Sequence, residues 1–169
     1  MGEKKASSIL NGKAILAVDD EPDVLDILEE EIKGVCGECF FDRADNFRTA
    51  KELLASYTYD LVILDIMGVS GFDLLTEAKV RKFPVVMLTA HALSPEALKK
   101  SIELGARAYL PKEKLEDIVP FLEDALRHEL LPGWKRLFEK LGDYFNNRFG
   151  AGWQNKEERF WKEFNDRIQ

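Results

Sequence analysis

The sequence predicts an α/β protein built on a doubly wound, parallel, five-stranded sheet. Short apolar runs, which are typical of buried strands, alternate along the chain with segments whose apolar residues recur at helical spacing. The chain has 169 residues, 46% of them hydrophobic and 33% charged, which suits one ordinary domain with a sizeable core. Parallel pairing is expected because a helix follows each strand and can carry the chain back across the sheet.

The first half of the chain supplies three of the predicted strands. Residues 14–18 form an apolar run that suits a strand buried on both faces, and Pro22 then begins a helix, since proline fits a first helical turn. The elements expected after this helix are a strand at 39–41, a helix at 47–56, a strand at 61–64 that ends at Asp65, and a helix at 72–82.

The second half of the chain continues the same alternation. A strand is expected at 85–88, and Ser94-Pro95-Glu96 then predicts a helix start, because serine caps a helix and proline suits its first turn. A short strand at 108–110 and a last helix at 115–128 complete the fold. Pro120 fits this helix only if it lies in a first turn.

Polar residues follow four of the five predicted strands. In doubly wound sheets functional residues gather outside the carboxyl ends of the strands. Asp19 and Asp20 follow the first strand, Asp65 ends the third, Thr89 ends the fourth, and Lys112 lies just past the fifth. The sequence therefore predicts one site that contains these five residues.

Three carboxylates at one edge repel one another, and a divalent cation would relieve this repulsion. Mg²⁺ is typically held by one or two carboxylates together with water and phosphate oxygens. Asp20 and Asp65 are expected as direct ligands, Asp19 as a ligand through water, and the backbone carbonyl of Met67 as a third ligand. The alternative is that Asp19 and Asp20 only cap the helix that follows them.

A metal-bound carboxylate beside a lysine and a hydroxyl also suits the acceptance of a phosphoryl group, which depends mainly on positioning and charge neutralisation. Asp65 is the expected nucleophile. Lys112 and Mg²⁺ are expected to stabilise the phosphoryl oxygens, and Thr89 to donate a hydrogen bond to one of them.

Four segments stand in a characteristic order: Val18-Asp19-Asp20-Glu21-Pro22, Leu61-Val62-Ile63-Leu64-Asp65-Ile66-Met67, Met87-Leu88-Thr89-Ala90, and Gly105-Ala106-Arg107-Ala108-Tyr109-Leu110-Pro111-Lys112. Together they resemble the receiver domain of response regulators in two-component signalling. The resemblance implies a flavodoxin-like fold with strand order 2-1-3-4-5 over residues 10–130. It also implies a sensor histidine kinase as phosphate donor, Thr89 and Tyr109 as a switch pair, and output through protein–protein contacts.

The sequence departs from the family pattern at two places. The run from Asp65 to Gly71 is two residues shorter than the common Asp-Ile-Met-Met-Pro-Gly-Met-Asp-Gly and lacks its proline. Glu113 follows Lys112 where the family usually has proline after a cis bond, so a trans link or local strain is expected here.

Two further positions tune, in this family, how fast the phosphate is lost to water. They are held here by Met67, two residues after Asp65, and by His91, two residues after Thr89. An apolar Met67 and a bulky His91 are expected to restrict water and lengthen the phosphorylated lifetime.

Residues 131–169 differ from the rest in charge and aromatic content. Residues 1–132 carry 16 Lys and Arg against 25 Asp and Glu, whereas residues 133–169 carry 8 against 6 and half of the aromatic side chains. Two amphipathic helices are expected, joined around 149–153. They either fold back on the receiver or each other, or form a homodimer or partner-binding surface. A DNA-binding output is disfavoured because no basic cluster is present.

Other classes of protein remain as alternatives. A haloacid-dehalogenase-like phosphatase would also use Asp, Thr and Lys with Mg²⁺, but it needs a second acid where Met67 stands. A degenerate receiver that only binds partners is the other rival. No apolar run is long enough for a membrane helix and no signal-peptide core is present, so a cytoplasmic protein is expected.

The two cysteines, Cys36 and Cys39, agree with a reducing compartment, since two cysteines cannot form a multi-bridge framework. Their spacing is that of a redox motif. They precede a predicted strand, however, and do not start a helix that would lower a thiol pKa. A redox or metal-binding role is therefore disfavoured.

Overall fold

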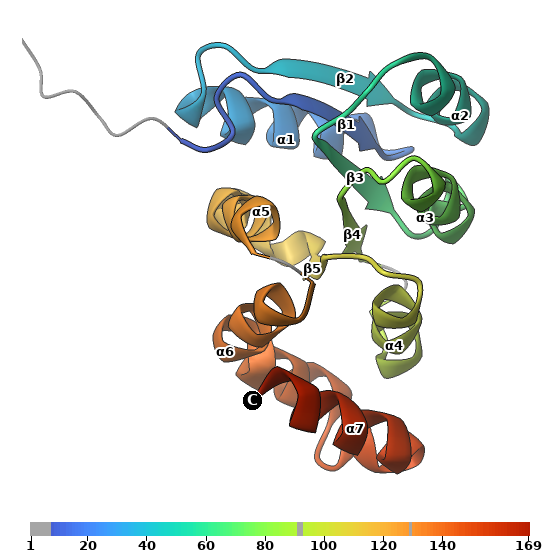
Figure 1. The fold of residues 1–169 in the computed structure, drawn as a ribbon, viewed down its shortest axis with the longest axis vertical. Coiled ribbons are helices and arrows are strands. Elements are labelled where there is room, and N and C mark those ends of the chain that lie inside the picture. The colour runs from blue at the N-terminus through green and yellow to red at the C-terminus, as the bar shows by residue number, and fades with distance from the viewer. Residues whose placement is uncertain (1–7, 91–92, 129) are drawn as a thin grey trace, which may run out of the picture.

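The computed structural model describes residues 8–90, 93–128 and 130–169, and confirms the predicted sheet (Figure 1). Five strands lie in the order β2-β1-β3-β4-β5, and every neighbouring pair is parallel. Their bounds are β1 Ala14–Val18, β2 Phe40–Ala44, β3 Leu61–Asp65, β4 Val85–Thr89 and β5 Ala108–Pro111. Because Asp65 pairs with Leu88 and Thr89 pairs with Pro111, the carboxyl ends of β3, β4 and β5 are level.

Helices cover both faces of this sheet. Figure 1 shows α1 and α5 on one face and α2, α3 and α4 on the other. Their bounds are α1 Pro22–Val35, α2 Phe47–Ser56, α3 Gly71–Val80, α4 Pro95–Glu103 and α5 Ile118–Arg127, and a 3₁₀ turn, η1 Lys112–Asp117, precedes α5. The predicted cap of α4 is present, because Oγ of Ser94 accepts a hydrogen bond from the Ala97 amide at 3.1 Å.

Most elements match their predicted bounds to within two residues, and two differ by more. Strand β2 runs to Ala44 rather than ending at Phe41; it is an edge strand, so it carries polar side chains and gives a weak apolar signal. The last predicted helix, 115–128, is divided into η1 and α5. Pro120 has no N–H to donate to the carbonyl of Glu116, so a single α-helix starting at Leu115 would lose a hydrogen bond there. It lies instead in the first turn of α5.

The core is centred on the middle of the sheet. Every residue of β3 and β4 is buried, because helices lie on both faces of these strands. The buried apolar side chains hold β3 and β4 in place. Asp65 and Thr89 are the last residues of these two strands. The position of the candidate site therefore follows from the packing of the sheet.

The C-terminal segment folds back against the β5 side of the sheet. It consists of α6 Leu130–Phe149, a 3₁₀ turn η2 Trp153–Glu157, and α7 Glu158–Ile168. In Figure 1 these orange and red helices lie next to α4 and α5. Nε1 of the fully buried Trp134 donates a hydrogen bond to the carbonyl of Ala106 at 2.9 Å, and the buried aromatic residues of α6 and α7 join the core of the sheet.

Cys36 and Cys39 form a disulfide between the end of α1 and β2. The expectation of two reduced cysteines is therefore wrong for this structure. Their Cα atoms lie 5.9 Å apart, which is within the range that a disulfide requires. Among the described residues, no helix is both long and apolar enough to span a bilayer.

Candidate functional site

Three consecutive acids follow β1. One carboxylate oxygen from each of Asp19, Asp20 and Glu21 lies within 4.8 Å of the other two, and Asp19 is fully buried while the other two residues are exposed. The Glu21 amide donates a hydrogen bond to Oδ1 of Asp19 at 2.9 Å, which fixes the buried carboxylate. Glu21 is the N-cap of α1 and no side chain caps this helix, so the acidic pair does not serve as a helix cap.

Lys112 joins this acidic run to Asp65. Its Nζ lies 2.8 Å from Oδ2 of Asp19, 3.3 Å from Oδ1 of Asp65 and 3.3 Å from Oε1 of Glu21. The lysine side chain is only 8% exposed. Residues from the ends of β1, β3 and β5 thus meet at one point, as the positions of the strand ends predict.

Burial and like charge dominate the electrostatics of the two buried acids. Burial, followed by the negative charge of Asp19, raises the pKa of Asp65 to about 7, and Asp20 contributes in the same direction. Burial also raises the pKa of Asp19, while Lys112 opposes this shift. Burial would lower the pKa of Lys112, but its contacts with Asp19 and Asp65 prevail and raise it. The site therefore favours additional positive charge.

Thr89 and Tyr109 are both buried near the ends of β4 and β5. The Tyr109 hydroxyl accepts a hydrogen bond from the Ser94 amide at 3.1 Å, directly before α4. The Tyr109 ring lies against Phe145 of α6, with ring centroids 6.0 Å apart. The C-terminal helices therefore cover the predicted switch tyrosine.

The short loop after Asp65 closes through left-handed backbone. Gly68 has φ +82° and Ser70 has φ +55°, and the Gly71 amide donates a hydrogen bond to the carbonyl of Ile66 at 3.1 Å. A Cβ on Gly68 would overlap the Asp20 carboxylate, and a Cβ on Gly71 would overlap the Asp65 carbonyl. These conformations let a loop two residues shorter reach α3.

Three predicted positions remain, namely Met67, His91 and Glu113. The Met67 side chain is 53% exposed in the loop after Asp65. His91 lies outside the described residues. The expected trans link between Lys112 and Glu113 is present, since the described residues contain no cis peptide bond.

The donor chemistry fits a magnesium ion, and the predicted ligand set of Asp19, Asp20, Asp65 and the Met67 carbonyl stays a prediction. All the donors are oxygens, and one carboxylate oxygen from each of Asp19, Asp20 and Glu21 lies within 4.8 Å of the others. Glu21 belongs to the compact cluster, whereas Asp65 is linked to it through Lys112. Sequence reasoning missed Glu21 and Gly68. The signals were a third acid in the run after β1 and a glycine in the shortened loop.

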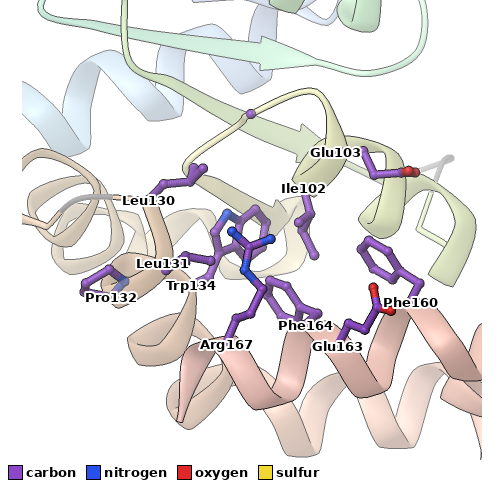
Figure 2. A pocket seen from close by; sticks show the side chains of 11 residues that line it. Ile102, Glu103, Leu130, Leu131, Pro132, Trp134, Phe160, Glu163, Phe164 and Arg167 are labelled. Carbon is purple, nitrogen blue, oxygen red and sulfur yellow. The ribbon is translucent and has the colours of Figure 1, made fainter.

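A separate cavity of about 580 Å³ lies on the C-terminal side of the molecule. Figure 2 shows Ile102 and Glu103 of α4 facing Phe160, Glu163 and Phe164 of α7 across it. None of the acids at the strand ends lines this cavity. It therefore marks incomplete packing between α4 and α7 and is not part of the acidic site.

Comparisons with known proteins identify the family of this chain. The family model for the response regulator receiver domain matches residues 15–123. The chain is 38% identical over 110 residues to the sensory transduction protein LytR of Staphylococcus haemolyticus, which covers 62% of this chain and 43% of that protein. It is 31% identical over 107 residues to the phosphate regulon transcriptional regulatory protein PhoB of Pseudomonas aeruginosa, which covers 60% and 45%. It therefore matches less than half the length of either curated relative.

A solved structure agrees with these sequence matches. The receiver domain protein of Methanospirillum hungatei, described as CheY-like, superposes with a TM-score of 0.60 at 25% identity and covers 68% of this chain and 93% of that one. The matched region of the family model contains the ends of all five strands and every acid of the site. The chain therefore belongs to the response regulator receiver domain family of two-component signalling.

Proposed function

We propose that the chain accepts a phosphoryl group on Asp65 from a sensor histidine kinase, in a reaction that depends on Mg²⁺. The observation that carries this proposal is the position of the Lys112 ammonium between two buried carboxylates, those of Asp19 and Asp65. A buried lysine beside a strand-end aspartate provides charge neutralisation where phosphoryl oxygens would develop negative charge.

The reaction places defined demands on these residues. A carboxylate oxygen of Asp65 forms the new bond to phosphorus while the bond from phosphorus to the kinase's imidazole nitrogen breaks, and the leaving imidazole takes up a proton. Asp65 must be ionised to attack, and Lys112 stabilises its ionised form. Mg²⁺ held by Asp20, Asp65 and the Met67 carbonyl, with Asp19 as a ligand through water, would neutralise charge on the transferred group.

We further propose that Thr89 and Tyr109 pass on the phosphorylated state. The Thr89 hydroxyl, at the end of β4, donates a hydrogen bond to a phosphoryl oxygen once the bond to Asp65 has formed. The Tyr109 hydroxyl holds the backbone at Ser94, a few residues beyond Thr89. Residues 10–130 form the receiver, and residues 131–169 form an extension through which output contacts are made.

A phosphatase of the haloacid-dehalogenase kind is less well supported. Such enzymes need a second acid two residues after the nucleophile, where this chain has the half-exposed, apolar Met67. One relative is an enzyme of another class, a probable cyclic di-GMP phosphodiesterase of Vibrio cholerae. Because the match covers only 23% of that protein, it does not support a phosphodiesterase function for this chain. A degenerate receiver is the other alternative, and the presence of Asp65, Thr89 and Lys112 argues against it.

Incubation with acetyl phosphate and Mg²⁺ separates the three candidates. A persistent adduct that mass spectrometry locates on Asp65, and that Asp65→Asn and EDTA both abolish, supports a phosphoacceptor. Repeated turnover of acetyl phosphate without accumulation of an adduct supports the phosphatase. No reaction at all, with a folded protein, supports the degenerate receiver and overturns the proposal.

A further inference from the structure

We propose that helix α6 is an internal effector of the phosphoacceptor site: its packing on Tyr109 and on the turn after Lys112 favours the phosphorylated form of Asp65. This inference rests on the proposed function and extends it to the C-terminal helices. Two independent contacts carry it, one through an aromatic ring and one through an ion pair.

The first contact is between Phe145 and Tyr109. Both side chains are fully buried, and their ring centroids lie 6.0 Å apart. Phe149 also stacks on Phe145, with centroids 5.5 Å apart and an interplanar angle of 3°. Phe145 therefore packs on the Tyr109 ring in its buried position, so α6 stabilises that position of the tyrosine.

The second contact joins α6 to the residues directly after the site lysine. Nη1 of Arg148 lies 3.0 Å from Oε1 of Glu113, and Nζ of Lys114 lies 5.4 Å from the centroid of the Tyr144 ring. Glu113 follows Lys112 in the chain and stands where the sequence departs from the receiver pattern. Glu113, the residue that departs from the pattern, therefore supplies the carboxylate that pairs with Arg148 of α6.

The buried position of Tyr109 links α6 to the phosphoacceptor end of the sheet. The Tyr109 hydroxyl accepts from the Ser94 amide, and Ser94 is connected to Thr89 by the short segment after β4. A contact that stabilises one of two arrangements must favour every ligand that prefers the same arrangement. The resemblance to receiver domains implies that Tyr109 turns inward when Asp65 carries a phosphoryl group, so docking of α6 and phosphorylation favour each other by the same factor.

The contact between the C-terminal helices and α4 also leaves space for a movement on phosphorylation. The cavity of about 580 Å³ lies between the end of α4, the start of α6 and one face of α7 (Figure 2). Contacts across this seam include an exposed ion pair of 2.9 Å between Lys99 and Glu157, and Lys99 also lies over the Phe160 ring. Since surface ion pairs are weak, this pair adds little to hold the C-terminal segment to α4, whereas α6 is held to β5 chiefly by the buried contact of Phe145 with Tyr109.

The inference is tested by measuring how tightly the full chain binds beryllium fluoride at equilibrium in the presence of Mg²⁺. Phe145→Leu keeps an apolar side chain but removes the ring from Tyr109, and Arg148→Gln removes the ion pair with Glu113. Phe160→Ala is a control on α7, because the Phe160 ring contacts Trp161 and Phe164 of its own helix and Lys99 of α4, but makes no ring contact with Tyr109. Calorimetric titration gives the dissociation constant, and circular dichroism verifies folding.

Phe145→Leu is expected to raise the dissociation constant by a factor of about five or more, the lower end of usual allosteric couplings. Arg148→Gln should raise it by a smaller factor, and Phe160→Ala should leave it unchanged. In the wild type, beryllium fluoride should slow amide hydrogen exchange in α6. Equal or tighter binding by Phe145→Leu overturns the inference. If this variant does not fold, the exposed Arg148→Gln variant decides, and unchanged binding then overturns it.

The two proposals fail in different ways. A wild-type chain that takes no phosphate and binds no beryllium fluoride overturns the proposed function, and this inference with it. A wild-type chain that does both, while Phe145→Leu and Arg148→Gln match it, overturns the role of α6 alone.

Discussion

Nζ of Lys112 lies 3.3 Å from Oδ1 of Asp65, although the two residues belong to strand ends that β4 separates. The contact requires a long side chain that reaches across the end of the intervening strand. It also places the ammonium beside the carboxylate of Asp19, so that one cation serves two buried acids. The chemistry of the site depends on this shared charge.

Removing the lysine charge should abolish phosphorylation. In Lys112→Met, Asp65 loses its cationic partner, so its pKa is expected to rise further above 7 and the carboxylate becomes a poorer nucleophile near neutral pH. Carboxyl-carbon NMR titration gives the pKa, and acetyl phosphate labelling gives the activity. Lys51→Met, at an exposed position on α2, serves as the control and should behave as wild type.

Stability without metal should fall as pH rises from about 4 to about 7. The folded state keeps the Asp65 proton up to a pKa of about 7, whereas the unfolded chain releases it near 3.8. Unfolding therefore becomes easier across this window, by at most about 4 kcal/mol at 1.36 kcal/mol per pKa unit. Urea unfolding in EDTA across this range measures the effect. Asp65→Asn should flatten the profile, and an equally steep profile in that variant would assign the effect to other groups.

Gly68→Ala should impair the acidic cluster. The residue has φ +82°, and the added Cβ would overlap the Asp20 carboxylate, so we expect a loss of about 1–3 kcal/mol in stability and weaker Mg²⁺ binding. Gly34→Ala is the matched control, because nothing lies within 4 Å of its added Cβ. Since Gly34 lies in α1, this change should stabilise the protein slightly. Chemical unfolding and Mg²⁺ titration compare the two variants.

Trp134→Phe should destabilise the whole domain. The substitution removes the indole N–H that donates to the Ala106 carbonyl at 2.9 Å and leaves a buried acceptor unpaired, at a cost of about 1–3 kcal/mol. Denaturant unfolding measures the loss. Trp153→Phe loses a comparable bond to Asn146, near the far end of α6, and should cost less because that bond is only partly buried.

Met67→Asn should shorten the lifetime of the phosphorylated form. Met67 is half exposed beside the acceptor loop, and an amide there can hydrogen-bond an attacking water where the thioether cannot. Loss of phosphate after removal of acetyl phosphate gives the rate. Val80→Asn, at an exposed position at the end of α3, is the control, and equal rates in both variants would contradict the tuning role.

The parallel sheet made much of the site predictable from sequence. Apolar runs ended at Asp65 and Thr89, and parallel pairing brings such ends to one edge, so the meeting of Asp19, Asp65 and Lys112 followed from topology. The magnesium ligands, phosphoryl transfer and switch roles of these residues stay predictions that the experiments above test.

Contacts between distant segments were less predictable. Nothing local to Phe145 or Arg148 indicates that they reach Tyr109 and Glu113, since helical spacing gives the apolar face of α6 but not what it covers. The bounds of the edge strand β2 and of the divided last helix were predicted wrongly for a related reason. In both, polar residues or a proline weakened the periodic signal that defines an element.

The aromatic cluster of the C-terminal helices has a practical consequence. All three tryptophans of the chain, Trp134, Trp153 and Trp161, lie in this segment, and none lies in the sheet or the five helices around it. Intrinsic emission excited at the indole band therefore reports selectively on the seating of α6 and α7. Tryptophan emission of the native protein can therefore be used to follow the docking of α6 and α7, and no dye label is needed.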